Sequence, residues 1–169
     1  VHFYPDKHEW YEFNHRAAGE LRGMKGDIYD GGHRIPHIVK WTRKIKPGTT
    51  NNSLNTLASF YSTVADLLKL EVSSSDSYSL FSELINDVKI EEDRSIIHHS
   101  SEGHFSIRNG NWKMIEKLGS GGFSLPRRVE PTPGVMQERL YNMNNDLSEK
   151  IDLASKYPKI ISKMKNKLD

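Results

Sequence analysis

Apolar residues recur at helical spacing over residues 54–70 and predict the best-defined element of the chain. They fall on one face of an α-helix, at Leu54, Leu57, Ala58, Tyr61, Val64, Ala65 and Leu68. Ser53 or Asn52 is the predicted N-cap, because its side-chain oxygen can accept a backbone N–H of the first turn. A second, shorter helix is predicted within residues 77–86, after a serine-rich break at residues 73–75.

In the second half of the chain the pattern changes to short β-branched and aromatic runs. Strands are predicted in "RSIIHHS", "HFSIRN" and "WKMIEKL", at residues 94–100, 104–109 and 112–118. Asn109-Gly110 favours a type I′ hairpin turn between the last two. A long loop rich in proline and glycine follows over residues 119–138, and "RLYNM" at residues 139–143 predicts one more strand.

The C-terminal segment predicts a helix that starts at Pro158, because proline suits the first helical position. Its inward face carries Ile160, Ile161, Met164 and Leu168, and its wet face carries Lys159, Lys163, Lys165 and Lys167. Antiparallel strands with one helix packed on a face indicate an α+β fold for residues 94–169.

The front part of the chain predicts a different organisation. Residues 1–34 are rich in aromatics, glycine and charge but have no periodicity, which is typical of an irregular loop region. "PHIVKW" at residues 36–41 predicts a strand that begins at proline. One strand and one long helix do not close a sheet, so residues 1–93 are interpreted as part of a larger α/β layer whose earlier strands are absent.

Composition and charge exclude several classes of protein. The net charge of +2 gives no global basic field, which argues against nucleic acid as a partner. No run of 18 apolar residues predicts a membrane span. The chain has no cysteine, so it offers neither disulfides nor thiolate chemistry.

The stretch "RGMKGDIYDGGHRIP" at residues 22–36 predicts a local site for an anion. Lys25 lies between Gly23 and Gly26, and Arg22 and Arg34 are near in sequence. Glycines let the backbone approach a ligand closely, and an ammonium suits a tetrahedral oxyanion. The alternative is a flexible turn whose cations are merely solvated.

Histidines form two groups that could converge on one site. The eight positions are His2, His8, His15, His33, His37, His98, His99 and His104, with none in the last 65 residues. A zinc trio of His98, His99 and His104 is disfavoured, because adjacent residues on a strand point to opposite faces.

The chain resembles the sulfatase family over nearly its whole length from Leu21, and the glycine-rich stretch is the first of the motifs that carry this resemblance. In that family a loop of the form Gly-x-Lys-Gly-x-x-Tyr/Trp-Glu/Asp-Gly-Gly precedes Arg-x-Pro and a strand, as in "LRGMKGDIYDGGHRIPHIVKWTRKIKPGT". "LASFYSTVADLL", "HHSSEGHFSIRNGNWKMI", "GSGGFS" and "RLYNMNNDLSEKIDLASKYPKI" follow in the family's order. The resemblance implies the C-terminal part of an alkaline-phosphatase-like α/β sulfatase, with a small antiparallel sheet subdomain packed by a C-terminal helix.

The resemblance also implies residue roles. Lys25 matches the lysine that contacts the sulfate ester beside the leaving-group oxygen, where its charge would stabilise the transition state. Gly31, Gly32 and Arg34 match loop-shaping positions. The candidate substrate-binding residues are Arg22, His33, Arg34, His99 and His104. For His99 and His104 the alternative is a histidine at the rim of the sheet whose ring is satisfied by backbone groups.

Several family features are absent from this sequence. The formylglycine nucleophile, made from Cys or Ser in a Cys/Ser-x-Pro-Ser/Ala-Arg motif, and the acidic Ca²⁺ ligands precede the lysine loop in the family, so neither is supplied by this chain. "SLPRR" at residues 124–128 imitates the motif, but it follows the loop and has arginine at the fourth place. His37 and Thr42-Arg43 also depart from the family pattern.

The prediction is therefore a fragment of a sulfatase that acts on sulfate esters, of a carbohydrate or an aryl alcohol, and that is inactive without its missing N-terminal catalytic part. Two alternatives remain: a free-standing binding module for sulfated or other anionic glycans, with Arg22, Lys25, Arg34 and the histidines as a cradle, or part of a related phosphatase or phosphonate hydrolase. Periplasmic or extracellular localisation is implied by the resemblance alone.

Overall fold

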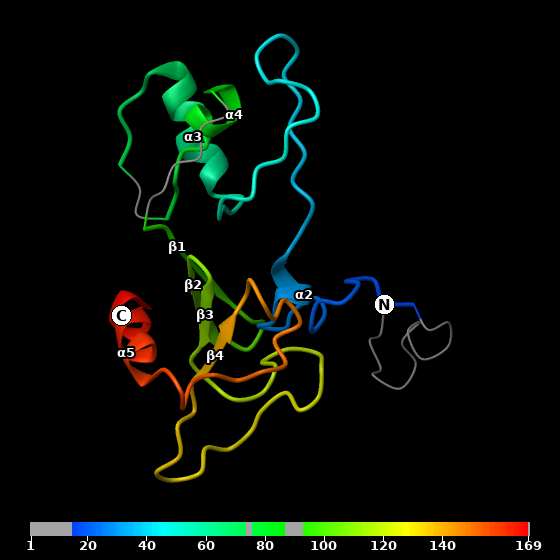
Figure 1. Cartoon of the computed structure of the whole chain (residues 1–169), viewed down its shortest axis with the longest axis vertical. Helices are drawn as coiled ribbons and strands as arrows, with labels where there is room; N and C mark the ends of the chain where they lie inside the picture. The colour runs from blue at the N-terminus through cyan, green and yellow to red at the C-terminus, as the bar shows by residue number, and fades with distance from the viewer. Residues whose placement is uncertain (1–14, 74–75, 87–92, 169) are drawn as a thin grey trace. The chain divides into compact units, whose positions relative to one another are not determined.

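The computed structural model describes residues 15–73, 76–86 and 93–168, and the chain falls into two compact units (Figure 1). One unit joins the residues up to Ile35 to those from Ile97 onward, and the other comprises Pro36–Ile96. The glycine-rich loop thus packs with the C-terminal sheet, whereas the predicted division at residue 93 grouped it with the helical segment. The division of the chain into residues 1–93, as part of a larger α/β layer, and residues 94–169, as a C-terminal subdomain, stays a prediction.

A four-stranded sheet in the order β1-β2-β3-β4 organises the C-terminal part of the chain. Its strands are β1 (Ser95–His99), β2 (Phe105–Asn109), β3 (Trp112–Ile115) and β4 (Arg139–Asn142), and β3 pairs antiparallel with both β2 and β4. Asn109 faces Trp112 in the register, so the two-residue hairpin loop is Gly110-Asn111, one position later than the predicted turn. The predicted α+β architecture is confirmed.

Each face of this sheet buries a different set of side chains because strand residues alternate between faces. On one face, Ile107, Met114 and Leu140 pack against Ile161 and Met164 of α5 (Pro158–Leu168), the C-terminal helix coloured red in Figure 1. The predicted inward face of this helix is therefore confirmed.

The opposite face of the sheet is covered by the glycine-rich loop. Ile28 and Tyr29 of the loop form a second core with Ile115, Tyr141 and Met143. The loop ends in α2 (Asp30–His33), a single helical turn. Lys25 is therefore carried on a loop that is anchored to the sheet by apolar burial immediately after it.

The unit formed by Pro36–Ile96 contains two helices, α3 (Ser59–Leu68) and α4 (Phe81–Asn86). The predicted helices are found, but the predicted N-cap is wrong, because Ala58 occupies that position and makes no side-chain capping bond. The Asn51 side chain accepts the backbone N–H of Ser53 at 2.7 Å, and such local bonds hold the backbone in a turn and delay the helix.

Two features of this unit depart from a self-contained fold. The strand predicted at residues 36–41 does not form among the described residues, and Ile38 is 90% exposed. In α3 and its preceding turn, the buried positions are the small residues Ser59, Ser62 and Ala65. The large apolar ones form an exposed stripe, here called the apolar stripe: Leu57, Phe60, Tyr61, Leu67 and Leu68. The segment at residues 36–41 is irregular because a strand without a neighbouring strand cannot complete its backbone hydrogen bonds.

Candidate functional site

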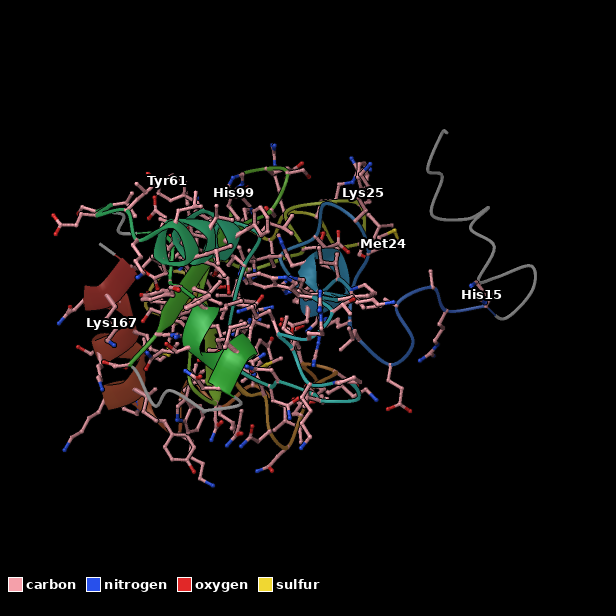
Figure 2. All side chains as sticks on the ribbon, turned by 90° about the horizontal axis from the view of Figure 1, so that it is seen from above. His15, Met24, Lys25, Tyr61, His99 and Lys167 are labelled. Atoms are coloured by element: carbon pink, nitrogen blue, oxygen red, sulfur yellow. The ribbon has the colours of Figure 1, made fainter. Side chains whose placement is uncertain are left out.

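Lys25 lies at the tip of a tight turn that its own neighbours close. The backbone N–H of Asp27 donates to the carbonyl of Met24 at 2.9 Å, and the N–H of Met24 donates to the Asp27 carboxylate at 2.8 Å. Gly26 has φ +88°, a conformation that other residues rarely adopt. Lys25 and Met24 lie side by side at this tip in Figure 2, and Lys25 is exposed. Its ammonium has no hydrogen bond or ion pair with another described residue.

Asp27 is fully buried and joins the lysine turn to the "GSGGFS" loop. One carboxylate oxygen accepts the backbone N–H groups of Phe123 at 2.7 Å and Ser124 at 3.0 Å, and the other accepts the Ser124 hydroxyl. Gly122 makes this approach possible, since a Cβ there would lie 2.5 Å from an Asp27 carboxylate oxygen. A buried carboxylate whose lone pairs are taken by four donors fixes the loop that carries Lys25.

Glycine also closes the base of the lysine loop. The N–H of Gly31 donates to the carbonyl of Arg22 at 2.7 Å, which brings the two ends of the loop together. A Cβ at Gly31 would lie 2.4 Å from that carbonyl oxygen, so the glycine is required by the close approach of two backbone segments.

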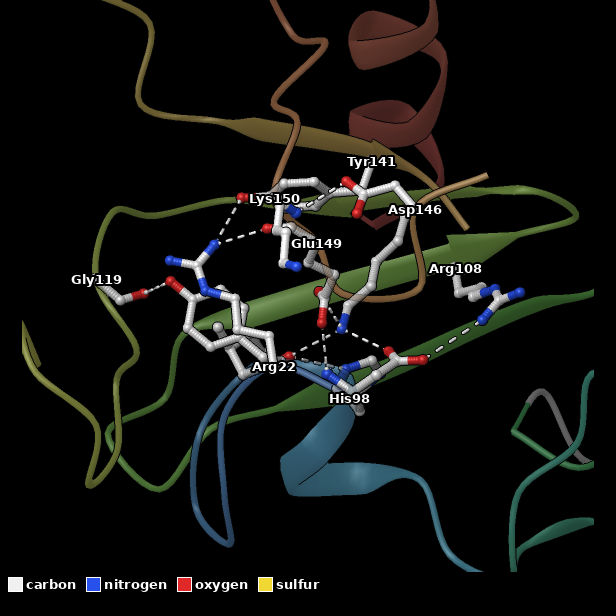
Figure 3. A network of polar contacts seen from close by, with 12 residues as sticks. Arg22, His98, Arg108, Gly119, Tyr141, Asp146, Glu149 and Lys150 are labelled. Carbon is white, nitrogen blue, oxygen red and sulfur yellow. Dashed lines mark hydrogen bonds and ion pairs between the residues drawn. The ribbon is translucent and has the colours of Figure 1, made fainter. Parts of the chain in front are cut away.

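Arg22 is held by three contacts at the base of the loop. Its guanidinium lies 3.9 Å from the centroid of the Tyr29 ring, and it donates to the backbone carbonyl of Glu149 at 2.8 Å and to the Tyr141 hydroxyl at 3.5 Å (Figure 3). Burial raises the pKa of Tyr141 to about 12 and also raises the pKa of Tyr29, so both phenols stay neutral beside the cation.

Beneath the loop, Lys113 of β3 is completely buried and binds two carboxylates. Its ammonium lies 2.7 Å from Asp30 and 2.8 Å from Glu149, and it donates to the Ile28 carbonyl at 3.1 Å (Figure 3). Glu149 accepts the N–H of Asp30 at 2.7 Å through its second oxygen. The register places Arg108 and Tyr141 on either side of Lys113, so a polar row of the sheet faces the loop.

The two carboxylates respond differently to burial. Burial raises the pKa of Glu149 despite the attraction of Lys113. Burial also acts to raise the pKa of Asp30, but the charges of Lys113 and Arg108 outweigh it and hold that pKa below its usual value. The Arg108 guanidinium lies 3.6 Å from Asp30. Shared pairing with a buried lysine therefore keeps Asp30 ionised at the start of α2.

An open cleft of about 690 Å³ lies beside the lysine loop. Three of the predicted site residues line it together, namely Arg22, Lys25 and Arg34, with Ser124, Glu149 and Lys150 among the other walls. Several cations and turn backbone groups along one concave surface suit a ligand that carries an anionic, tetrahedral group.

The predicted histidines lie in other surroundings. His33 packs on His98 with ring centroids 4.1 Å apart, and burial followed by the charge of Lys113 lowers the pKa of both rings, that of His98 to about 3. His99 is exposed and its Nδ1 donates to the Ser100 carbonyl at 2.8 Å, which leaves Nε2 as an acceptor. His104 is buried under Gly121. None of these rings is part of the cleft wall described above.

Three residues at the site were missed by the sequence interpretation: Asp27, Lys113 and Glu149. Each is a charged residue that is completely buried. Lys113 lies between the apolar residues Trp112 and Met114 in β3. This alternation predicts that the lysine points to solvent, unless the second face of the sheet is also covered by protein. Ile115, on the same face as Lys113, is the signal for that cover.

Neither a metal cluster nor a membrane span is found in the described part of the chain. No group of three or more His, Asp or Glu residues there could hold a metal ion. Among the described helices, none has the length and apolar character needed to cross a bilayer.

Comparison with known proteins identifies the relatives of this chain. No protein-family model matches it. The chain is 27% identical over 158 residues to N-acetylgalactosamine-6-O-sulfatase of Bacteroides thetaiotaomicron, an alignment that covers 92% of the chain and 30% of that protein. It is 30% identical over 162 residues to a sulfatase of Formosa agariphila, covering 88% of the chain and 28% of the relative.

A solved structure agrees with these alignments. The 6S-sulf protein of B. thetaiotaomicron, described in connection with the metabolism of multiple glycosaminoglycans, superposes with a TM-score of 0.76 at 25% identity, over 96% of this chain and 34% of that one. The chain thus spans about 30% of the length of the relatives that it matches. The resemblance predicted from the ordered motifs is confirmed.

Proposed function

Because this chain belongs to the sulfatase family over the region that it spans, we propose that it forms the sulfate-binding side of the active site of a sulfuric ester hydrolase. It would be the C-terminal part of a longer enzyme with an alkaline-phosphatase-like α/β fold. The observation that carries the proposal is the position of Lys25 at the tip of a doubly anchored turn that borders a cationic cleft. Its ammonium has no partner in the part of the chain that the structure describes.

Lys25 is the proposed catalytic residue. As the S–O bond of a sulfate ester breaks, negative charge builds on the leaving-group oxygen, and a preorganised ammonium beside that oxygen lowers the barrier. Anchoring of the turn through Asp27 reduces the reorganisation that the lysine would need during the reaction.

Arg22, Arg34 and the histidines are proposed to contact substrate. Arg22 and Arg34 border the cleft with Lys25, where a guanidinium can bind a sulfate or a sugar carboxylate through two parallel hydrogen bonds. His99 presents an acceptor nitrogen that could receive a sugar hydroxyl. Roles for His33 and His104 would require substrate to reach rings that are now packed against His98 and Gly121.

A sulfated carbohydrate is the proposed substrate class. One relative is named for the 6-O-sulfate of N-acetylgalactosamine, and one matching solved structure is described in connection with the metabolism of glycosaminoglycans. The cationic cleft is compatible with a chain that carries several anionic groups. Aryl sulfates remain a simpler substrate that the same lysine could serve.

The described residues do not fit a Ca²⁺ site, and the sequence has no formylglycine motif ahead of the lysine loop. The chain has no cysteine, and its one Ser-x-Pro-x-Arg stretch, at residues 124–128, follows the loop. The buried carboxylates of Asp27, Asp30 and Glu149 use their oxygens on backbone N–H groups, Ser124 and Lys113. We propose that both groups belong to residues outside this chain.

The apolar stripe of α3 supports the proposal that further parts of the enzyme pack on this chain. Leu57 is 73% exposed and Phe60 is 70% exposed, while small polar residues are buried on the other side of the helix. Exposed contiguous apolar surface of this kind marks an interface. The irregular segment at residues 36–41 would gain its missing strand partners from the same source.

Lys25→Ala in the full-length protein tests the proposal. Turnover of an aryl sulfate and of a sulfated galactosamine should fall about 10²-fold or more, because a charge contact made in the transition state is lost. Unchanged turnover would remove Lys25 from the mechanism. Phosphate-ester turnover that exceeds sulfate-ester turnover would favour the phosphatase branch, and tight glycan binding without any turnover would favour a binding module.

A further inference from the structure

We propose that Glu149 is a positioning residue for Lys25, acting through the base of the lysine loop; this inference rests on the proposed role of Lys25. Glu149 lies 124 residues from Lys25 in sequence and is completely buried. It contacts both ends of the loop, Arg22 and Asp30.

The first end is Arg22, immediately before the lysine turn. Its guanidinium donates to the backbone carbonyl of Glu149 at 2.8 Å while it lies on the Tyr29 ring at 3.9 Å. Since the Arg22 carbonyl accepts the N–H of Gly31 at 2.7 Å, the position of Arg22 also sets the closure of the loop.

The second end is Asp30, at the start of α2. One Glu149 oxygen accepts the N–H of Asp30 at 2.7 Å, and the other pairs with Lys113 at 2.8 Å. Lys113 in turn binds the Asp30 carboxylate and the Ile28 carbonyl. In Figure 3 the side chain of Glu149 extends into this network from the turn that contains Asp146 and Lys150.

The backbone of Glu149 indicates that this arrangement is maintained against strain. Its φ is +51°, a left-handed conformation that favours glycine or asparagine. Such a conformation persists when surrounding contacts determine it, and strained residues gather at functional sites. Here the side chain supplies those contacts, because both of its oxygens are used inside the protein.

Loss of these contacts of Glu149 should displace Lys25. The turn at residues 24–27 is closed by its own hydrogen bonds and tied to Phe123 and Ser124, so a shift at the base of the loop would change the angle at which the turn presents Lys25. Displacement of a catalytic group by about 1 Å is sufficient to lower turnover about 10²-fold. Binding of substrate by the rest of the cleft would change less, which predicts an effect on kcat more than on KM.

Glu149→Gln in the full-length protein is the first variant. The amide keeps the size of the side chain, but one carboxylate oxygen becomes an NH2 donor, which would face either the Asp30 N–H or the Lys113 ammonium, both also donors. We expect kcat for a sulfate ester to fall about 10-fold or more with KM changed less than about 3-fold. Glu130→Gln is the matched control, since Glu130 is exposed, and its kcat should not change.

The double variant Lys25→Ala with Glu149→Gln separates a positioning role from a merely structural one. If Glu149 acts through Lys25, the double variant should be no slower than Lys25→Ala, within about 2-fold. Fully multiplicative effects, or a Glu149→Gln enzyme with unchanged kcat, would overturn the inference. If Lys25→Ala itself leaves turnover unchanged, the proposed function fails instead, so the two failures are distinguishable.

Glu149→Asp serves as a second variant in case the glutamine variant does not fold. It keeps the charge for Lys113 but shortens the reach toward Asp30, so a reduced kcat with coupling to Lys25→Ala is again expected. A Glu149→Asp enzyme whose loss of kcat persists in full in the Lys25→Ala background would count against positioning.

Discussion

The ammonium of Lys113 lies 2.7 Å from the carboxylate of Asp30, although the two residues are 83 positions apart and belong to different elements. This ion pair joins the middle strand of the polar sheet face to the loop that carries Lys25. A lysine that is wholly removed from water is tolerated because Glu149 and the Ile28 carbonyl complete its coordination.

Lys113→Met should lower the free energy of unfolding of the 169-residue chain by about 3–5 kcal/mol. Removing one partner of a buried pair leaves the others uncompensated, and here two carboxylates would lose their cation. Lys117→Met is the control, because Lys117 is half-exposed and pairs with Glu116 at 3.5 Å at the surface, where such a pair is worth under about 1 kcal/mol. Urea unfolding of both variants measures the difference; equal losses would refute the buried-pair account.

Gly31→Ala should destabilise the chain by about 2 kcal/mol or more and abolish sulfate-ester turnover in the full-length protein. The added methyl would meet the Arg22 carbonyl oxygen at 2.4 Å and force the base of the lysine loop open. Gly134→Ala is a suitable comparison, because Gly134 has φ +77° but open space around it, so only about 1 kcal/mol of backbone strain is expected. A Gly31→Ala chain as stable as the wild type would contradict the proposed loop closure.

The elements of the C-terminal sheet could be predicted from sequence because their signals are local. Asn109 and Gly110 mark the hairpin to within one residue, and the spacing of Ile161 and Met164 identifies the buried face of α5. The lysine loop could be placed by its ordered motif, since glycines at close approaches leave a recognisable pattern.

What sequence could not provide depends on tertiary contacts. Glu149 and Lys113 look like surface residues in a linear reading, and only the packing of the lysine loop on the second face of the sheet buries them. The strand expected at residues 36–41 failed for the complementary reason: its local propensity needs a neighbouring strand, and the described chain contains none beside it.

The stability of the chain should fall as the pH drops below about 6.5. Burial, with the charges of Lys113 and His33, lowers the pKa of His98 from 6.5 to about 3, so the unfolded chain binds this proton first. The contribution of neutral His98 to the free energy of unfolding is therefore complete above pH 6.5, the pKa of the ring in the unfolded chain, and is lost as the pH falls toward 3. At about 1.4 kcal/mol per pKa unit, the loss should reach about 3 kcal/mol near pH 4.

His98→Gln tests the origin of this loss. Glutamine can still donate to the Ile28 carbonyl, which the His98 ring approaches at 3.4 Å, but it does not titrate. Unfolding by urea at a series of pH values should show a shallower decline for this variant, while His99→Gln, at an exposed position, should follow the wild type. A decline of equal slope in all three chains would assign the effect to other groups, with His33 as the next candidate because burial and the charge of Lys113 also lower its pKa from 6.5.

The apolar stripe predicts that one substitution has different effects in the 169-residue chain and in the full-length protein. Phe60→Ser should change the stability of the isolated chain by less than about 0.5 kcal/mol, because the ring is 70% exposed there. In the full-length protein the same change should cost about 2 kcal/mol or more, since a ring buried against further parts of the enzyme would be lost. Asp66→Ser, at an exposed polar position of α3, should be neutral in both. Equal, small effects of Phe60→Ser in the two proteins would mean that nothing covers the stripe, and the proposal that the rest of a sulfatase packs on this helix would lose its structural support.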